Sequence, residues 1–269
     1  MKKALNDCVV LETERLAPDV FSLRLETDIA NKAKAGQFVS LYSHDGGHLL
    51  PRPISICEID AAEGQLRLVY RVVGFGTAEF SMMKPGNKIR VMGPLGNGFP
   101  LVENIDDNRR NIILIGGGIG IPPMLSVANT IHEGVPKGKD CRITAVLGYR
   151  DHHTFLSDDL YKMADNLIIA TDDGSRGTHG TVIDAMNEHD VSGDVIYACG
   201  PMPMLRGVKA WSEENGIPAW ISLEERMACG IGACLGCVCK TTDKDDHSQV
   251  NNARVCKDGP VFPAEYVTL

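Results

Sequence analysis

The sequence predicts an N-terminal antiparallel β-barrel, then an α/β domain with a parallel sheet, and then a short cysteine-rich segment. Three observations support this order. Short runs of alternating apolar and polar residues come first, and continuous apolar runs separated by helix-like stretches follow them. Five of the nine cysteines fall between Cys229 and Cys256. At roughly 150 residues per domain, a chain of 269 residues fits two domains with a small appendage.

The barrel is predicted over residues 1–103. Residues 20–26 place Phe21, Leu23 and Leu25 on one face and polar side chains on the other, which is typical of a half-buried strand. Further strands are expected over 38–42, 66–73 and 88–92, with glycine-rich turns between them. Short strands at this spacing favour a small barrel. A short helix is expected over 78–83, with Thr77 as its N-cap.

The α/β domain is predicted over residues 108–220, after a polar linker at 104–110. Its expected strands are 111–115, 143–147, 167–171 and 195–198. Its expected helices are 123–132, 156–164, 182–188 and 202–215. Apolar strands that alternate with helices are typical of a parallel sheet covered on both faces.

Composition excludes some classes of function. The net charge of −8 argues against broad nucleic-acid binding, which needs a basic face. No run approaches the roughly 18 apolar residues of a membrane-spanning helix, and polar residues interrupt any signal-peptide core near the start. We therefore expect a cytoplasmic chain that binds neither nucleic acid nor membrane.

The most specific motif is formed by Cys229, Cys234 and Cys237, which have C-x4-C-x2-C spacing, with Cys256 further on. This is the spacing of plant-type [2Fe-2S] ferredoxins. A loop that curls around a cluster needs unusual backbone angles, and the glycines at 230, 232 and 236 permit them. A four-cysteine zinc site is the main alternative, but the second C-x2-4-C knuckle that zinc sites usually have is missing. Inert thiols are a further alternative.

Two other residues near the motif are weaker candidates. Cys239 lies two residues after Cys237, and we interpret it as a non-ligand because it does not fit the spacing. His247 could replace a cysteine, as in Rieske centres, but a single histidine in a polar segment is more often solvated. The segment 221–269 has little apolar patterning, so we expect its fold to depend on a bound metal.

A glycine turn follows the first strand of the α/β domain, and it indicates a nucleotide site. Glycines there let the backbone approach a pyrophosphate at the start of a helix. A second strand ends in a Gly-Pro turn at the same edge of the sheet, and Asp172-Asp173 ends a third. The strict G-x-G-x-x-G fingerprint is absent because Ile121 occupies its last position, so a plain tight turn is the alternative. The candidates are Gly116, Gly117, Gly118, Gly120, Cys199, Gly200 and Pro201.

The predicted barrel also carries residues suited to an anionic ligand. Arg52 begins one strand, Arg71 lies on another, and Gly76-Thr77 precedes the short helix. Two arginines and a helix N-terminus could form a diphosphate site. Tyr70 could pack on a flat ring. Taken singly, an arginine on a strand is more often only a solvated charge.

Together these motifs resemble the ferredoxin–NADP reductase superfamily, in which the barrel holds FAD and the α/β domain holds a nicotinamide nucleotide. The short cysteine tail is similar to that of the electron-transfer subunits of NAD-dependent (class 1B) dihydroorotate dehydrogenases, and the resemblance covers essentially the whole chain. It implies that FAD contacts Arg52, Pro53, Ile54, Ser55, Val69, Tyr70, Arg71, Gly76 and Thr77, and that Cys229, Cys234, Cys237 and Cys256 hold the cluster. The superfamily's Arg-x-Tyr-Ser motif is altered here, because Pro53-Ile54 removes its flavin-stacking tyrosine.

The resemblance also implies an activity. Hydride exchange between NAD(H) and FAD, and single-electron transfer through the [2Fe-2S] cluster, would connect the chain to an FMN-containing catalytic subunit in UMP biosynthesis, in a heterotetramer with two copies of each. No residue is assigned to catalysis with certainty, although Cys199 could lie near the nicotinamide. Asp172 and Asp173 would repel a 2′-phosphate, which favours NAD(H) over NADP(H).

Two other functions compete with this one. The FAD/[2Fe-2S] small subunit of a ferredoxin:NADP oxidoreductase or sulfide dehydrogenase is closely similar, but in that group an Asp takes one cluster position, whereas four cysteines are available here. A non-enzymatic redox or zinc-binding regulatory module would require loss of the flavin or nucleotide site, and the residues of both are present.

Overall fold

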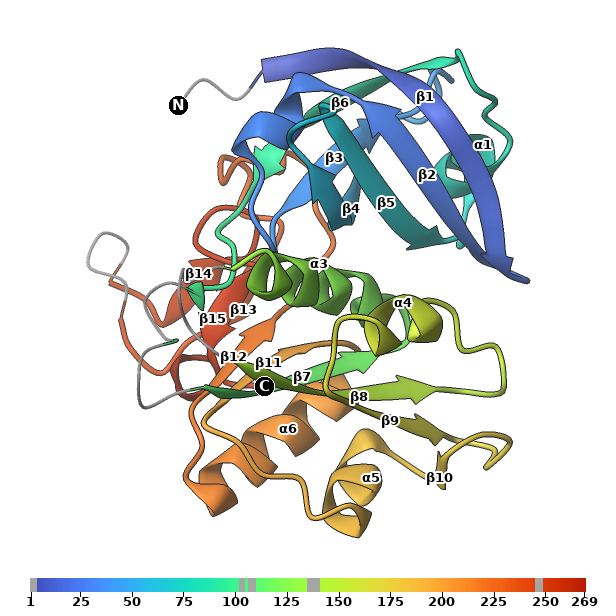
Figure 1. Cartoon of the computed structure of the whole chain (residues 1–269). Helices are drawn as coiled ribbons and strands as arrows, with labels where there is room; N and C mark the ends of the chain where they lie inside the picture. The colour runs from blue at the N-terminus through green and yellow to red at the C-terminus, as the bar shows by residue number, and fades with distance from the viewer. Residues whose placement is uncertain (1–3, 102–104, 106–109, 135–140, 245–248) are drawn as a thin grey trace.

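The computed structural model describes residues 4–101, 105, 110–134, 141–244 and 249–269. The predicted linker at 104–110 and His247 therefore lie largely or wholly outside the described residues. The N-terminal part is a closed antiparallel barrel with strand order β1-β2-β5-β4-β3-β6 (Figure 1). Its strands are β1 (Ala4–Ala17), β2 (Val20–Glu26), β3 (Phe38–Tyr42), β4 (Arg52–Asp60), β5 (Gln65–Arg71) and β6 (Lys88–Leu95). The predicted barrel is confirmed.

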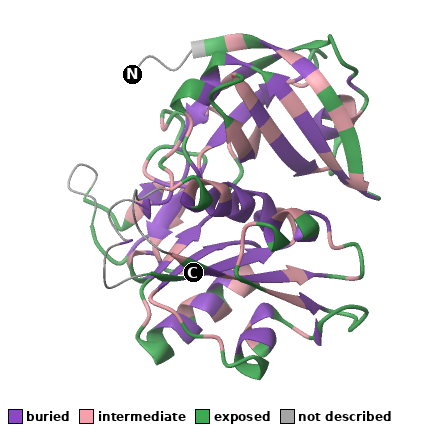
Figure 2. Ribbon diagram, in the orientation of Figure 1, coloured by how far each residue is buried: buried purple, intermediate pink, exposed green. Residues whose placement is uncertain are grey.

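Apolar and polar residues alternate along the strands, and the apolar side chains fill the barrel. Buried positions recur along the barrel strands (Figure 2). Leu23 and Leu25 of β2 are fully buried, as are Leu66 and Leu68 of β5 opposite them. The 3-10 helix η1 (Asp28–Lys32) and helix α1 (Phe75–Ser81) pack against the barrel strands. The apolar cluster inside the barrel therefore consists of residues from the N-terminal part alone.

The second domain is a seven-stranded sheet with order β10-β9-β8-β7-β11-β12-β15. Its strands are β7 (Asn111–Gly117), β8 (Arg142–Tyr149), β9 (Asn166–Thr171), β10 (Thr178–His179), β11 (Val195–Cys199), β12 (Ala219–Ser222) and β15 (Val261–Pro263). All the neighbouring pairs are parallel except β12 with β15. The predicted α/β domain is confirmed.

Helices cover both faces of this sheet (Figure 1). The 3-10 helix η2 (Gly118–Gly120) leads into α3 (Ile121–His132), which lies between the sheet and the barrel and packs against β4, with α4 (Ser157–Tyr161) beside it. Helices α5 (Val182–Glu188) and α6 (Met202–Asn215) cover the opposite face. Apolar side chains from the sheet and from α3 form one continuous core.

Three predicted details differ from the structure. Strands β1, β10, β12 and β15 and the strands of the cysteine-rich tail were not predicted, and α4 is shorter than the expected helix. Thr77 is not the N-cap of α1, because the helix begins at Phe75 with Gly74 as its N-cap. The Thr77 hydroxyl instead accepts hydrogen bonds from the backbone N–H groups of Val73 (3.0 Å) and Gly74 (3.2 Å) and so closes the turn before the helix.

The cysteine-rich tail is anchored by more than its cysteines. Strands β13 (Val238–Lys240) and β14 (Asn252–Arg254) form a hairpin, while β15 joins the large sheet and η3 (Ala264–Tyr266) follows it. Val255, Phe262 and Val267 are buried in the core that the sheet shares with α5 and α6. The tail therefore has apolar anchoring, which the sequence pattern did not reveal.

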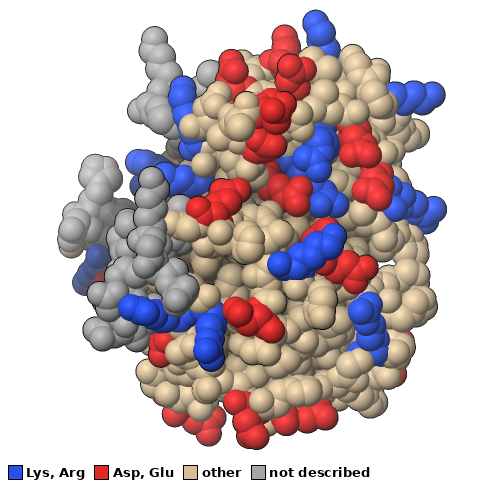
Figure 3. Space-filling model, viewed as in Figure 1, with Lys and Arg blue, Asp and Glu red and all other residues tan. Residues whose placement is uncertain are grey.

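Charged side chains of both signs are interleaved on the viewed face in Figure 3, in keeping with a net charge of −8. Among the described residues, no helix combines the length and the apolar character needed to cross a membrane.

Candidate functional site

The structure arranges the four motif cysteines as two pairs. The thiols of Cys229 and Cys234 lie within hydrogen-bonding reach of each other, and so do those of Cys237 and Cys256. Cys237 and Cys256 are buried, whereas Cys234 is exposed and Cys229 is partly exposed. One pair is thus enclosed by the fold and the other faces the surface.

The loop around these cysteines directs backbone N–H groups toward sulfur. Cys229 Sγ accepts from the amides of Ile231 (3.5 Å) and Ala233 (3.3 Å), and Cys256 Sγ accepts from the amide of Gly232 (3.1 Å). Gly230 and Gly232 have φ of 66° and 82°, which β-carbon-bearing residues rarely adopt. Although partial burial raises the pKa of Cys229, these N–H groups and the backbone and thiol of Cys234 outweigh it and lower the pKa to about 6. The loop therefore favours thiolate, the form that binds metal.

This arrangement fits a binuclear cluster better than a single zinc ion. Among the described residues, no three cysteine sulfurs lie within 4.8 Å of one another. In the same part of the chain, three potential ligand atoms come that close only at Asp151, His152 and His153. Two separated pairs suit two iron atoms, whereas one tetrahedral zinc would need all four sulfurs to converge.

Cys239 lies in β13 and packs against the core. Its burial raises the pKa of its thiol to about 11, so its surroundings favour a protonated side chain.

The cysteine segment is held against the barrel. Asn97, two residues after β6, forms an isolated β-bridge with Pro260. Its amide donates to the Gly259 carbonyl (2.7 Å), and its Nδ2 donates to the Asp258 carbonyl (2.9 Å). A β-carbon on Gly230 would lie 3.1 Å from Ser40 Oγ of β3, so the two backbones approach closely. The cluster loop therefore lies beside the predicted flavin domain.

The two predicted nucleotide turns meet at the carboxyl edge of the sheet. β7 runs into Gly118–Gly120 and then α3, and β11 runs into Gly200, Pro201 and α6. A β-carbon on Gly120 would overlap the Cys199 carbonyl and lie 2.6 Å from the Gly200 nitrogen. One on Gly117 would lie 3.0 Å from Pro201. Only glycine allows these turns to pack together.

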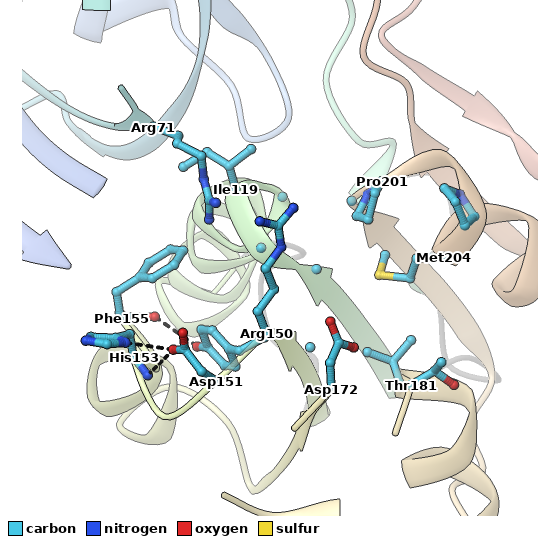
Figure 4. Close-up of a pocket in the computed structure, with 18 of the residues that line it drawn as sticks. Arg71, Ile119, Arg150, Asp151, His153, Phe155, Asp172, Thr181, Pro201 and Met204 are labelled. Carbon is cyan, nitrogen blue, oxygen red and sulfur yellow. Dashed lines mark hydrogen bonds and ion pairs between the residues drawn. The ribbon is translucent and has the colours of Figure 1, made fainter. Parts of the chain in front are cut away.

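A cavity of about 770 Å³ opens at this edge, between the two domains (Figure 4). Of the predicted nucleotide residues, Gly117, Gly118, Gly120, Gly200 and Pro201 line it. Gly116 and Cys199 do not; both are buried behind its wall. Arg71 enters the cavity from the barrel and is paired with Asp19 at 3.2 Å. The cavity is therefore shared between the two domains.

Sequence reasoning missed several charged residues that line this cavity, among them Arg150 and Glu224. Arg150 follows β8 and its side chain extends toward Arg71 (Figure 4). Glu224 follows β12, and the surrounding protein raises the pKa of its carboxyl group above the usual value. Both lie just beyond the carboxyl ends of parallel strands, where ligands bind. Recognising the four-residue strand β12 in the sequence would have revealed Glu224.

Cys199 lies one layer behind the cavity, next to Ser222 and Glu224. Burial raises the pKa of its thiol, and the negative charge of Glu224 raises it further. Cys199 is therefore a neutral thiol in the fully buried core. Its predicted place near the nicotinamide remains a prediction.

On the barrel, the structure brings Arg52 and Gly76 together. A β-carbon on Gly76 would lie 2.7 Å from Arg52 Nε, so the guanidinium packs directly over the first turn of α1. This turn carries backbone N–H groups that an α-helix leaves unpaired. A guanidinium beside such N–H groups suits a diphosphate, which supports FAD binding here. The Thr77 hydroxyl is already occupied in the turn, so a contact from Thr77 would come through its backbone.

The other predicted flavin residues differ in accessibility. Arg52, Pro53, Ile54 and Ser55 of β4 are each partly open to solvent. Val69 and Tyr70 are 2% and 1% exposed, and the Tyr70 ring meets Phe80 edge to face inside the barrel. The interpretation of Tyr70 as a ring that stacks on the flavin is therefore wrong, because its side chain faces the barrel core. Backbone contacts from Val69 and Tyr70 remain predictions.

Three family models match the chain in the same order as the structural parts. Residues 7–99 match an oxidoreductase FAD-binding domain and residues 114–210 an oxidoreductase NAD-binding domain. Residues 224–268 match the iron–sulfur cluster binding domain of dihydroorotate dehydrogenase B. The chain thus combines FAD-binding, NAD-binding and iron–sulfur domains.

Relatives and solved structures agree with this combination of domains. The electron transfer subunit of dihydroorotate dehydrogenase B (NAD(+)) from Streptococcus pneumoniae strain R6 is 40% identical over 260 residues, 97% of each chain. The Fusobacterium nucleatum subunit is 38% identical and covers 98% of this chain and 99% of its own. A structure of an NADH-dependent reduced ferredoxin–NADP oxidoreductase has a TM-score of 0.83 at 31% identity and covers 99% of this chain and 91% of its own. Phthalate dioxygenase reductase, at 19% identity and a TM-score of 0.63, covers 94% of each chain and shares the fold. The chain belongs to the electron transfer subunits of NAD-dependent dihydroorotate dehydrogenase B.

Proposed function

We propose that this chain passes electrons between NAD(H) and an FMN-containing dihydroorotate dehydrogenase catalytic subunit, in the cytoplasm and as a step of UMP biosynthesis. Bound FAD would exchange a hydride with NAD(H), and a bound [2Fe-2S] cluster would carry single electrons toward the partner. We further propose the domain limits 1–103, 108–220 and 221–269, and an assembly with two copies of each subunit.

The proposal rests on the position of the barrel, which contacts both the nucleotide cavity and the cysteine segment. Its Arg71 reaches into the nucleotide cavity, while its β3 and Asn97 contact the cysteine segment. The flavin domain thus contacts both the nucleotide site and the cluster loop. The exposed pair, Cys229 and Cys234, would face the partner.

The residues of the chain have separate tasks in this scheme. Arg150 would balance the charge of the dinucleotide phosphates, and the glycine turn would let its backbone approach them. Arg71, which is predicted to contact FAD, would lie between the two cofactors. Arg52 and Gly76 would hold the flavin diphosphate. Pro201 and Met204, which line the same wall of the cavity, would exclude water from one side of the nicotinamide.

Mixing the purified chain with the FMN-containing subunit tests the function. Dihydroorotate should then reduce NAD+ only when both chains are present, because neither holds the whole electron path. A rate with the FMN-containing subunit alone that equals the rate of the mixture would contradict the proposal.

A second candidate follows from the similarity to the NADH-dependent reduced ferredoxin–NADP oxidoreductase structure. In this alternative the chain would be the FAD/[2Fe-2S] small subunit of such an enzyme. The four cysteines of this chain form two pairs. This favours the dihydroorotate dehydrogenase subunit, because in the alternative class of small subunits an Asp takes the place of one cluster cysteine. Ferredoxin-dependent activity, with none toward dihydroorotate, would favour the alternative.

Asp172 is expected to set the preference for NADH over NADPH. Its carboxylate lies in the cavity at the end of β9, where it can accept from a ribose 2′-hydroxyl and repel a 2′-phosphate. Asp172→Asn should raise the ratio of kcat/KM for NADPH to that for NADH by about tenfold, the factor that roughly 1.4 kcal/mol represents. Flavin reduction in a stopped-flow instrument measures both constants.

Asp173→Asn is the matched control for that experiment. Asp173 is adjacent in sequence, but its carboxylate accepts from the Ser175 amide at 2.9 Å and does not line the cavity. Its coenzyme ratio should stay unchanged. Equal ratios of kcat/KM for NADPH to kcat/KM for NADH in the two variants would show that Asp172 does not discriminate between the ribose 2′-hydroxyl and a 2′-phosphate.

A further inference from the structure

A buried hydroxyl group lies between the barrel and the loop of residues 229–237. Ser40 of β3 is 1% exposed, and its Oγ has no hydrogen-bonding partner among the described residues. A β-carbon on Gly230, the residue after Cys229, would lie 3.1 Å from this Oγ. A buried hydroxyl without a partner costs free energy, so its position at the cysteine loop calls for an explanation.

The other neighbours at this contact are apolar. The same β-carbon position on Gly230 lies 3.3 Å from Leu95 Cδ1 and 3.5 Å from Met92 Cε, both of β6. Met92 is also the residue opposite Ser40 in the pairing of β3 with β6. Carbon atoms accept no hydrogen bond, so these two groups do not satisfy the hydroxyl.

Ser40 also lies next to the predicted flavin strand. Val39 and Leu41 belong to the core inside the barrel, so Ser40 between them points outward. In the pairing of β3 with β4 it lies opposite Pro53, which is predicted to contact FAD. In Figure 1 the orange and red segment after β12 runs beside this part of the barrel. Ser40 is therefore placed between the flavin strand and the cysteine loop.

We propose that the Ser40 hydroxyl donates a hydrogen bond to a sulfur of the bound [2Fe-2S] cluster. This inference rests on the proposed function, because it presumes that the cluster is held by the loop that begins at Cys229. Sulfur that carries negative charge is a good acceptor for a hydroxyl. Backbone amides of the loop already donate to the sulfurs of Cys229 and Cys256, and Ser40 adds a donor from the barrel.

The burial of Ser40 favours the cluster over the flavin as the acceptor. The residues of β4 that are predicted to contact FAD, 52–55, are each partly open to solvent. Ser40 is closed off from that open surface and meets Gly230 of the cysteine loop instead. A flavin on β4 would have to displace the loop to reach the hydroxyl, whereas a cluster inside the loop would not.

Such a hydrogen bond would make Ser40 a positioning residue that also raises the reduction potential of the cluster. The reduced cluster carries one more negative charge than the oxidised cluster, so a donor to its sulfur stabilises the reduced form more. Ser40→Ala removes the donor and leaves a side chain of nearly the same shape. The variant should fold normally, because the hydroxyl makes no hydrogen bond to the described part of the chain.

Ser40→Ala is tested in the full chain with its cofactors bound. A redox titration followed by electron paramagnetic resonance should give a midpoint potential of the cluster that is lower by about 59 mV, which corresponds to a tenfold shift in a one-electron equilibrium. The midpoint potential of the flavin should stay unchanged. After exchange into D2O, pulsed electron paramagnetic resonance of the reduced wild-type cluster should detect a coupled deuteron that is missing in the variant.

Thr13→Val is the matched control. Thr13 Oγ1 is also buried without a hydrogen-bonding partner among the described residues, but it lies on β1, which does not pair with β3. Its substitution should leave both potentials and the deuteron signal unchanged.

Three results for Ser40→Ala would overturn the inference and leave the proposed function standing. They are an unchanged cluster potential with an unchanged deuteron signal, a shift in the flavin potential alone, and a folded chain that binds no iron, since the last would show a purely structural role. A wild-type chain that holds no [2Fe-2S] cluster would overturn the proposed function and this inference together.

Discussion

A Cys237→Ser chain is expected to reduce its own flavin with NADH at the normal rate but to lose electron transfer to the catalytic subunit. Cys237 is 2% exposed, and its sulfur accepts from the Cys256 amide at 3.4 Å, so it belongs to the enclosed cysteine pair. A serine oxygen is a poor replacement for a thiolate on iron. The loss should exceed the roughly 10- to 100-fold that removal of an outer partner of a metal site costs.

Two rapid-mixing measurements separate the steps in that experiment: flavin bleaching by NADH in the chain alone, and dihydroorotate-linked turnover in the complex. Cys239→Ser is the control, because Cys239 is a part-buried cysteine two residues away that we interpret as a non-ligand. It should retain iron and turnover. Normal onward transfer in Cys237→Ser would show that the cluster is not on the electron path.

Gly120→Ala is expected to lose both NADH binding and stability. The added β-carbon would overlap the Cys199 carbonyl, a backbone atom that cannot move without shifting β11. Overpacking of this kind costs about 1–3 kcal/mol, and more where the backbone is the obstacle. We expect a lower Tm in thermal unfolding, together with a raised KM for NADH in the protein that remains folded.

Gly118→Ala is the matched control for Gly120→Ala. Gly118 lies in the same turn, but a β-carbon there would meet nothing within 4 Å. Its φ of 52° leaves only the left-handed backbone penalty of about 1–2 kcal/mol. If the two variants unfold at the same temperature, the contact between the two nucleotide turns does not stabilise the domain.

The strongest sequence predictions came from residues that serve local geometry. Residues 20–26 have a clear period of two and form a strand with those bounds, and the strand predicted over 38–42 also has the predicted bounds. The glycines of the nucleotide turn were found because close backbone approach leaves glycine as the one residue that fits. The cysteine motif was found because the ligand spacing is determined by the loop that must wrap the metal.

The features that sequence reasoning missed depend on contacts between distant segments. Strand β12 has only four residues, and it is stabilised by β11 on one side and β15 on the other. Glu224 belongs to the cavity only because β12 ends there. Tyr70 and Thr77 were assigned to the flavin site from their position in a motif, but packing turned the Tyr70 ring into the barrel core and the turn before α1 engaged the Thr77 hydroxyl. A single sequence does not record such contacts.

An anaerobic absorbance titration of the purified chain with NADH tests whether electrons pass from NADH to flavin and cluster within this chain. We expect the flavin band to bleach together with the broad iron–sulfur absorbance, because one chain holds the nucleotide cavity, the barrel and the paired cysteines. A colourless protein with one zinc ion per chain and no response to NADH would contradict it.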